Sequence, residues 1–320
     1  MHLLLMLSLT CNLTLGELVF PWAHSITIES SWQKLTDTCD VELPRKVYYK
    51  DIKNKSLKDF INVGDAVSIS LGYNERNTEL FTGFIRQINP VVPVKVSCED
   101  AMWSLKQNNV TGDFDNATLL DIVKHVAPGM EYNVLDAQIG KYCIPEDWSA
   151  AKVFEDLKSS YGLYSFIREG KLQVGLQYDP DYARTIEWEL GRYALNENLE
   201  YFNKENLKLK VKAISIGKDN KKTTYEFGDN GGEERTMHFY NLAESELKAA
   251  AERELNRLKY DGYRGDFTMF GMPVVRHGDK VKLTDALYEE RSGTYWVDKV
   301  VTKWNTSEGY KQIVTLGPVV

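Results

Sequence analysis

Two stretches of the sequence repeat one pattern about two hundred residues apart: Gly64-Asp65-Ala66-Val67-Ser68-Ile69-Ser70-Leu71 and Gly278-Asp279-Lys280-Val281-Lys282-Leu283. Each begins with a Gly-Asp pair, alternates apolar with polar residues, and is followed at the same offset by an aromatic segment, Phe81–Ile85 or Tyr295–Lys299. Strict alternation is typical of a half-buried strand, and glycine favours a turn before it. Two such matches arise by chance in a chain of 320 residues, so the duplicated β module that they suggest needs support from elsewhere.

The first third of the chain, residues 1–106, has the pattern of further short strands separated by turn signals. Such spacing favours a β-barrel or sandwich. A lysine-rich piece, Lys50–Asp59, is expected to be a loop or short helix inserted between strands. The predicted strands are Leu5–Leu15, Ser25–Ser31, Thr38–Leu43, Ala66–Leu71, Leu80–Ile88 and Val92–Cys98.

Residues 107–180 change to a mixed α/β pattern. Thr118–Val126 has an apolar helical face and ends before Pro128-Gly129. A second helix is predicted over Asp147–Tyr161, with Asp147 as its cap and Gly162 as its end. A β-hairpin over Leu163–Gly175 is expected to follow it.

Residues 181–320 return to β structure with one long helix. A capping box at Asn241 and Glu244 predicts the start of that helix, which runs to about Lys259. Gly217–Lys222 is predicted to be a turn, and Gly228–Glu234 a flexible glycine-rich loop. The predicted strands are Asn206–Ile216, Asp266–Phe270, the second Gly-Asp unit with its aromatic segment, and Gln312–Leu316.

Composition restricts the class of protein. The net charge of −7 and the pI near 5.4 offer no basic groove, so we expect no sequence-specific nucleic-acid binding. No stretch approaches the roughly 18 apolar residues of a membrane helix, so no stable membrane insertion is expected. Cys39 and Cys98 continue the alternation of apolar residues and are predicted to be small buried residues on strands.

The first sixteen residues allow two interpretations. Their apolar content is compatible with a secretion signal, but no Lys or Arg precedes the apolar stretch. Leucines at alternate positions from Leu5 to Leu15 favour a first β-strand instead.

We find no motif for catalysis, cofactor binding or metal binding. The sequence lacks the nucleophile-elbow, HExxH and phosphate-loop patterns, and its five histidines have no partner spacing. Histidines such as His125 and His277 are therefore predicted to be surface or turn residues. Adjacent acidic pairs, Glu233-Glu234 and Glu289-Glu290, would face opposite ways on a strand, which indicates solvation rather than a pair of catalytic carboxylates.

The densest aromatic and glycine cluster is Tyr260-Asp261-Gly262-Tyr263-Arg264-Gly265. It could clamp a ligand or partner, but the position just after a helix favours a helix end leading into a strand, with tyrosines packed on the barrel wall.

Three parts of the chain carry a recognisable succession: Ser25–Trp32, Trp148–Leu163 with Gly170-Lys171-Leu172, and Leu258–Gly265 followed by Phe267–Phe270, Pro273 and Gly278–Val281. This succession resembles the late control D family of phage proteins, the hubs of contractile tails and related injection systems. It covers most of the chain in order.

The resemblance implies a β-rich α+β fold with two related β-barrel tube domains joined by a mixed α/β segment. The domains would span 1–106, 107–180 and 181–320. It also implies a homotrimeric ring in the baseplate of a virion or injection particle, assembled in the bacterial cytoplasm, with a tail tube protein and a central spike protein as partners. The family carries no catalytic residues to transfer. Because the chain ends about twenty residues after its second aromatic segment, the spike is expected to be a separate protein.

Two other functions stay open from the sequence. One is a tail-associated cell-wall hydrolase, which would need a cleft with converging carboxylates. The other is a secreted carbohydrate-binding β protein, which the secretion-signal interpretation of the N-terminus would favour.

Overall fold

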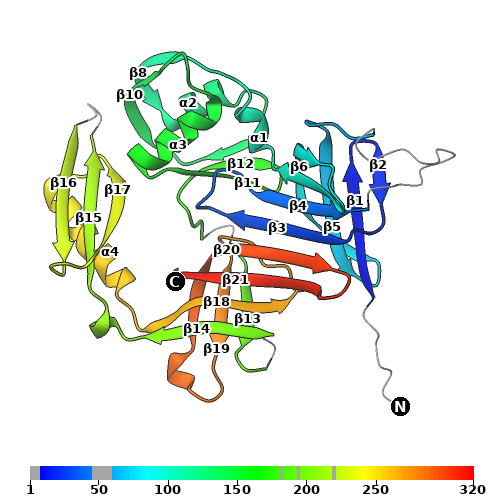
Figure 1. Ribbon diagram of the computed structural model, residues 1–320. Helices are drawn as coiled ribbons and strands as arrows, with labels where there is room; N and C mark the ends of the chain where they lie inside the picture. The colour runs from blue at the N-terminus through cyan, green and yellow to red at the C-terminus, as the bar shows by residue number, and fades with distance from the viewer. Residues whose placement is uncertain (1–7, 45–59, 181–182, 193–194, 218–220) are drawn as a thin grey trace.

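The computed structural model describes residues 8–44, 60–180, 183–192, 195–217 and 221–320 (Figure 1). The described residues form a β-rich α+β fold, as predicted, with four α-helices and several sheets. Three predictions fall partly or wholly outside them: the start of the Leu5–Leu15 strand, the Lys50–Asp59 insertion and the centre of the Gly217–Lys222 turn.

The first β unit is a curled sheet around its own apolar core. Its strands are ordered β3-β4-β7-β6-β5-β1-β2, and every neighbouring pair along this path is antiparallel. Alternate residues of each strand face the core; Leu13, Ile26 and Val96 are fully buried there. The strands are β1 (Leu9–Leu15), β2 (Leu18–Phe20), β3 (Ser25–Ser31), β4 (Thr38–Leu43), β5 (Ala66–Tyr73), β6 (Arg76–Asn89) and β7 (Val94–Glu99).

The second β unit has a separate core of aromatic and β-branched side chains, among them Phe267, Tyr295 and Val314. Its strands follow the order β14-β18-β21-β20-β19-β13. They are β13 (Thr185–Glu189), β14 (Asn196–Phe202), β18 (Gly262–Phe270), β19 (Lys280–Thr284), β20 (Gly293–Asn305) and β21 (Gly309–Val319).

The two units have the same strand order. The path β3-β4-β7-β6-β5-β1 in the first corresponds, strand for strand, to β14-β18-β21-β20-β19-β13 in the second. The last pair differs, because β1 lies antiparallel to β5 whereas β13 lies parallel to β19.

The two Gly-Asp turns make the same hydrogen bonds. In each, the glycine N–H donates to a carbonyl of the following aromatic strand (2.8 and 2.7 Å), and the N–H of that strand residue donates back to the aspartate carbonyl (2.9 Å in both). Each glycine has positive φ, +92° and +77°, which glycine adopts without strain. The residues are Gly64, Asp65 and Ile85 in the first unit and Gly278, Asp279 and Val297 in the second.

A β-bulge follows this contact in both units. The pairing of β6 with β7 shifts between Ile85 and Gln87, and the pairing of β20 with β21 shifts between Val297 and Lys299. Because bulges re-aim the strand at a defined place, a shared bulge is independent support for the duplication that the sequence suggests.

The units are joined edge to edge. The second half of β20 pairs with β3, so the strands of both units belong to one 13-stranded sheet (Figure 1). The strand order is an open path, and among the described strands neither unit closes into a barrel.

A mixed α/β part lies between β7 and β13 in the chain. Helices α2 and α3 pack against a two-stranded and a three-stranded sheet over a common core that includes Ile122, Phe154 and Leu172. Its elements are α1 (Met102–Leu105), β8 (Gly112–Thr118), α2 (Leu119–Val126), β9 (Tyr132–Val134), β10 (Gln138–Ile144), α3 (Ala150–Tyr161), β11 (Tyr164–Arg168) and β12 (Lys171–Gly175).

A small α/β unit is inserted between β14 and β18 and projects to one side in Figure 1. One face of its sheet packs against α4, through Val211 and Leu247 among others. Its elements are a 3₁₀ turn (Lys204–Asn206), β15 (Leu209–Ile216), β16 (Lys222–Gly228), β17 (Glu233–Tyr240) and α4 (Glu244–Leu258); a second 3₁₀ turn, Glu289–Arg291, lies between β19 and β20.

Two helix starts differ from the prediction. Ser149, not Asp147, caps α3, because its hydroxyl accepts the Lys152 N–H at 3.2 Å. Helix α4 begins after Ala243 rather than Asn241, since the Ala243 N–H donates to the Glu246 carboxylate at 2.8 Å. At α3 the local sequence offers two polar candidates, Asp147 and Ser149, whereas at α4 the N-cap residue is an alanine and the Glu246 carboxylate supplies the acceptor.

Gly228–Glu234 is also shorter as a loop than predicted. Strand β16 ends at Gly228 and β17 begins at Glu233, and both flank β15. The polar, half-exposed strands carry little apolar alternation, which is why the sequence pattern missed them.

Candidate functional site at the junction of the two β units

The junction of the two β units is a seam of seven residue pairs between β20 (Lys299–Asn305) and β3 (Ser25–Ser31). The Glu29 carboxylate lies on it, 2.9 Å from Lys299 of the other unit and 2.7 Å from Lys34. Partial burial acts to raise the pKa of Glu29, but the hydrogen bonds from both lysines outweigh it and the pKa is lowered. The seam is therefore held by backbone pairing together with an ion pair.

Asp298, at the bulge of β20, contacts Trp32 of the first β unit and Tyr178 of the segment after β12. Its carboxylate accepts from the Trp32 ring N–H at 3.2 Å and from the Tyr178 hydroxyl, and its carbonyl accepts from Ser31. The Tyr178 ring stacks on Trp296 with centroids 4.8 Å apart. Burial raises the pKa of Asp298, although both donors oppose this shift.

A cavity of about 420 Å³ opens beside the seam, where the two β units meet the β11–β12 turn of the mixed part. Its walls come from β3, β6 and β20 and from the segment before Gly278. The charged and titratable residues around it are Asp37, Glu79, Asp100, Arg168, Glu169, Arg276 and His277.

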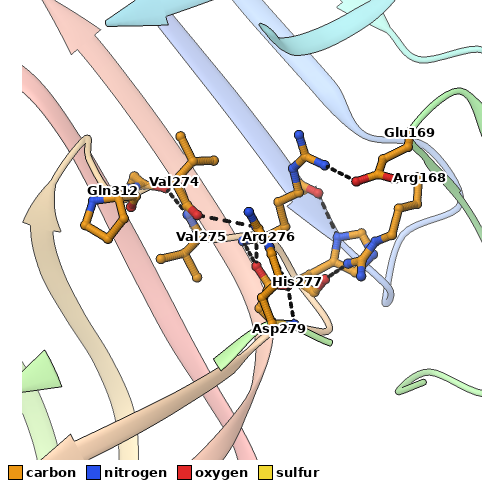
Figure 2. Close-up of polar contacts among 11 residues, drawn as sticks. Arg168, Glu169, Val274, Val275, Arg276, His277, Asp279 and Gln312 are labelled. Carbon is orange, nitrogen blue, oxygen red and sulfur yellow. Dashed lines mark hydrogen bonds and ion pairs between the residues drawn. The ribbon is translucent and has the colours of Figure 1, made fainter. Parts of the chain in front are cut away.

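His277 lines this cavity, and Figure 2 shows it among the polar contacts of the surrounding loop. Its residue is 1% exposed, one ring nitrogen lies 2.7 Å from the Ser30 hydroxyl, and the Phe166 ring meets it edge-on at 4.8 Å. The Arg168 guanidinium donates to the His277 carbonyl. Among the described residues, the Nε2 atom has no hydrogen-bond partner.

The imidazole of His277 is neutral at physiological pH. Burial, followed by the charges of Arg168 and Arg276, lowers its pKa to about 3. A neutral histidine beside two cations can accept or donate a hydrogen bond, but it lacks a carboxylate orienting partner of the kind that a catalytic base needs.

The loop that carries His277 is fixed by Asp279 and Gln312 (Figure 2). The Asp279 carboxylate accepts from the Arg276 N–H at 2.9 Å and from the Arg184 guanidinium at 2.6 Å. Gln312 accepts from the Val275 N–H and donates to the Pro273 carbonyl, each at 2.9 Å. These bonds make the loop a rigid part of the second unit.

Two aspartates from the first unit face the cavity from the opposite wall. The Asp100 carboxylate accepts from the Asp37 N–H and from the Met102 N–H, both at 2.9 Å. Burial raises the pKa of Asp37 to about 6, and burial together with the nearby Asp37 charge raises that of Asp100. The pair is fully engaged with backbone donors, which is typical of a structural role.

The acidic pairs weighed from the sequence do not lie at this cavity. Glu233 and Glu234 lie exposed on β17, where they pair with Arg235 and Lys212. Glu289 and Glu290 lie exposed in the second 3₁₀ turn. Over the part of the chain that the structure describes, no group of three or more His, Cys, Asp or Glu is placed to hold a metal ion.

His277 lies in a turn, as predicted, but it is buried rather than on the surface. The signal was the apolar pair Val274-Val275 just before it, which leads the chain inward. His125, by contrast, is exposed on α2 and contacts the Thr111 carbonyl at 2.7 Å.

The Tyr260–Gly265 cluster packs internally, in agreement with the structural interpretation. The Tyr263 N–H donates to the Tyr295 hydroxyl at 3.0 Å, and Arg264 lies over the rings of Phe202 and Tyr260, each at 5.4 Å. Strand β18 begins at Gly262, four residues earlier than predicted. The cysteine prediction is confirmed: Cys39 and Cys98 are buried, unbridged and directly opposite each other on β4 and β7.

None of the helices in the described ranges is both long and apolar enough to span a lipid bilayer.

Comparison with known proteins shows the fold. No family model matches the sequence, and no curated protein matches it. Among solved structures, the chain is similar to a tail protein from Neisseria meningitidis, with a TM-score of 0.66, 14% identity and 96% of each chain covered.

Two more structures give the same result. A 43 kDa tail protein of prophage MuSo2 from Shewanella oneidensis matches with a TM-score of 0.65 and 16% identity, over 96% of this chain and 97% of that one. A component of the type VI secretion system of E. coli matches with a TM-score of 0.59 and 11% identity, over 96% of this chain and 76% of that one. The chain has the fold of these phage tail and secretion proteins.

Proposed function

We propose that this protein is a structural component of a phage tail or related injection particle, and that it serves there as the baseplate hub. The observation that carries the proposal is the edge-to-edge joining of two equivalent β units in a chain with the fold of tail proteins. The described residues contain a rigid junction rather than a set of groups aligned on a reacting atom, which favours assembly over catalysis.

The hub would be a ring of three chains. A contact that joins unequal surfaces closes only when copies complete a ring, and two equivalent units in each of three chains present six similar modules. Six modules match a sixfold tail tube on one face, while three chains match a threefold spike on the other. The tube and spike proteins are accordingly the proposed partners, and the particle is the proposed location.

The three-part division into 1–106, 107–180 and 181–320 stays a proposal as well. Under it, the two β units form the ring wall, and the mixed part and the inserted α/β unit project from it. The cavity at the junction would then be a structural feature of the wall.

The experiment is to purify assembled particles from producing cells and to determine the stoichiometry of the chain by quantitative mass spectrometry. We expect three copies for every six tube subunits in one ring. Absence from the particle, or hydrolysis of purified peptidoglycan by the isolated chain, would instead favour the tail-associated hydrolase.

A further inference from the structure

The junction within the chain shows how one β unit receives another. Strand β20 is longer than its hairpin partner β19, which pairs only with Gly293–Trp296. Beyond the bulge, the same side of β20 is therefore open, and β3 fills it over Lys299–Asn305. The second unit thus offers an inner strand edge, and the first unit supplies its outermost strand.

The duplication identifies the equivalent strands. The matched bulges make β6 the counterpart of β20, and the pairing across each sheet makes β14 the counterpart of β3. Both β3 and β14 have seven residues and lie outermost. In the first unit, Ile88 pairs with Val96, Val96 with Val41, and Val41 with Ile26. In the second unit, Val300 pairs with Val314, Val314 with Phe267, and Phe267 with Glu197. These two series align β3 with β14 and so fix the register.

The counterparts of the joined edges are both open in the described chain. On β6, residues after Ile85 continue past the end of β5, and Gln87 and Asn89 are exposed. Strand β14 pairs only with β18, and its residues Asn196, Glu197, Asn198 and Glu200 are exposed. Open strand edges readily pair with another strand.

We infer that β14 of one copy pairs with β6 of the next copy, repeating between chains the seam that β3 and β20 form within the chain. This inference rests on the proposed ring and specifies its interface. The register follows from the internal seam: Gln87 lies opposite Phe202, Ile88 opposite Tyr201, and Asn89 opposite Glu200 of the neighbouring copy.

Side-chain chemistry fits this register. Glu200 takes the place of Glu29, and Gln87 takes the place of Lys299, which are ion-paired in the internal seam. A glutamine side-chain amide can donate to a carboxylate at the same position.

The seam between chains is shorter than the internal one. Strand β6 ends at Asn89, and Pro90 and Pro93 have no N–H to donate. Val91 and Val92, 45% and 72% exposed, continue the edge and would be covered by β14 of the neighbour. Three backbone pairs and the covering of these two valines thus replace seven pairs.

Cysteine cross-linking tests the register directly. We would introduce Asn89→Cys and Glu200→Cys together, in a Cys143→Ser background that removes the exposed native thiol. Opposite residues of an antiparallel pair have Cα atoms about 4.5–5.5 Å apart, which permits a disulfide. Within one chain β6 and β14 are not neighbours in the sheet, and a band above the monomer mass on the gel identifies a bond between chains.

Mild oxidation is expected to give covalent dimers and trimers on a non-reducing gel, while either single variant alone gives none. The matched control moves one cysteine along β14, Asn89→Cys with Glu197→Cys, and is expected to lose most of the cross-linked product. Light scattering on the same samples measures the oligomeric state, and so tests the ring separately from the β14–β6 seam. Trimers that do not cross-link, or that cross-link equally in the control, overturn this seam and leave the ring; monomers without cross-links contradict both.

Discussion

Asp279 and Asp65 show how single residues define the duplicated fold. Each follows a glycine with positive φ, and each carboxylate accepts the backbone N–H three residues earlier, at 2.9 and 2.7 Å. Asp279 is the more deeply buried of the two and also holds Arg184. The turn therefore positions both the following strand and the His277 loop.

Replacement of Asp279 by alanine is expected to destabilise the protein. The part-buried Arg276 N–H would lose its acceptor, and a hydrogen bond to a charged group contributes about 1.5–3 kcal/mol. Urea unfolding should therefore show a lower free energy of unfolding for Asp279→Ala. Glu308→Ala, at an exposed position in the turn between β20 and β21, is the control and should match the wild type; equal stability of both variants would contradict the role given to Asp279.

His277 predicts a pH dependence of stability. Its pKa falls from about 6.5 in the unfolded chain to about 3 in the fold. Between these values the unfolded chain binds the extra proton, so the contribution of His277 to stability is complete above pH 6.5 and is lost as the pH falls toward 3. Asp37 acts in the opposite direction, since its raised pKa of about 6 favours the folded state as the pH falls.

The difference between wild type and His277→Gln isolates the histidine. We expect the free energy of unfolding of the wild type to fall more steeply from pH 6.5 to 4 than that of the variant, because glutamine does not titrate. Parallel curves over that range would show that the imidazole is not held neutral by burial.

At the scale of single elements, the cap of α3 separates two sequence candidates. Ser149 makes the capping hydrogen bond, whereas Asp147 lies outside the helix. Ser149→Ala should cost about 1 kcal/mol and lower the melting temperature, while Asp147→Ala should change it little. A larger loss in Asp147→Ala, measured by thermal denaturation, would restore the aspartate as the cap.

The exposed turn between β6 and β7 makes a second element-scale prediction. If Val91 is covered in the ring, Val91→Lys should weaken association roughly tenfold, because burying a valine side chain contributes about 1.5 kcal/mol or more. Leu287→Lys, in the exposed connection between β19 and β20, is the matched control. Sedimentation at a series of concentrations measures both, and identical association would exclude Val91 from the interface.

Elements with strong periodicity could be predicted from the sequence, and those without it could not. Ser25–Ser31 and Thr38–Leu43 were predicted to the residue, since each alternates buried and exposed positions. Strand β14 was missed because its residues are largely polar and exposed, as an unpaired edge strand allows. Because β14 is exposed along an open strand edge, it is also a candidate interface.

At the scale of the whole molecule, the sequence suggests the duplication, but it does not predict how the two β units join. The Gly-Asp repeat predicts two related β units. Nothing in the local pattern shows that β20 pairs with β3, or that His277 and Asp37 line one cavity, because both depend on the placement of residues more than two hundred positions apart. Such contacts follow from packing of whole units.

The proposed ring of three chains can be tested by the mass of the protein in solution. Multi-angle light scattering would be measured on the purified chain, alone and with a spike protein encoded beside it, over a wide concentration range. A ring of three chains would have a mass of about 110 kDa, three times the 36.7 kDa chain, and we expect this species in at least one of the two conditions. A strict monomer of 36.7 kDa in both conditions, at every concentration, would contradict it.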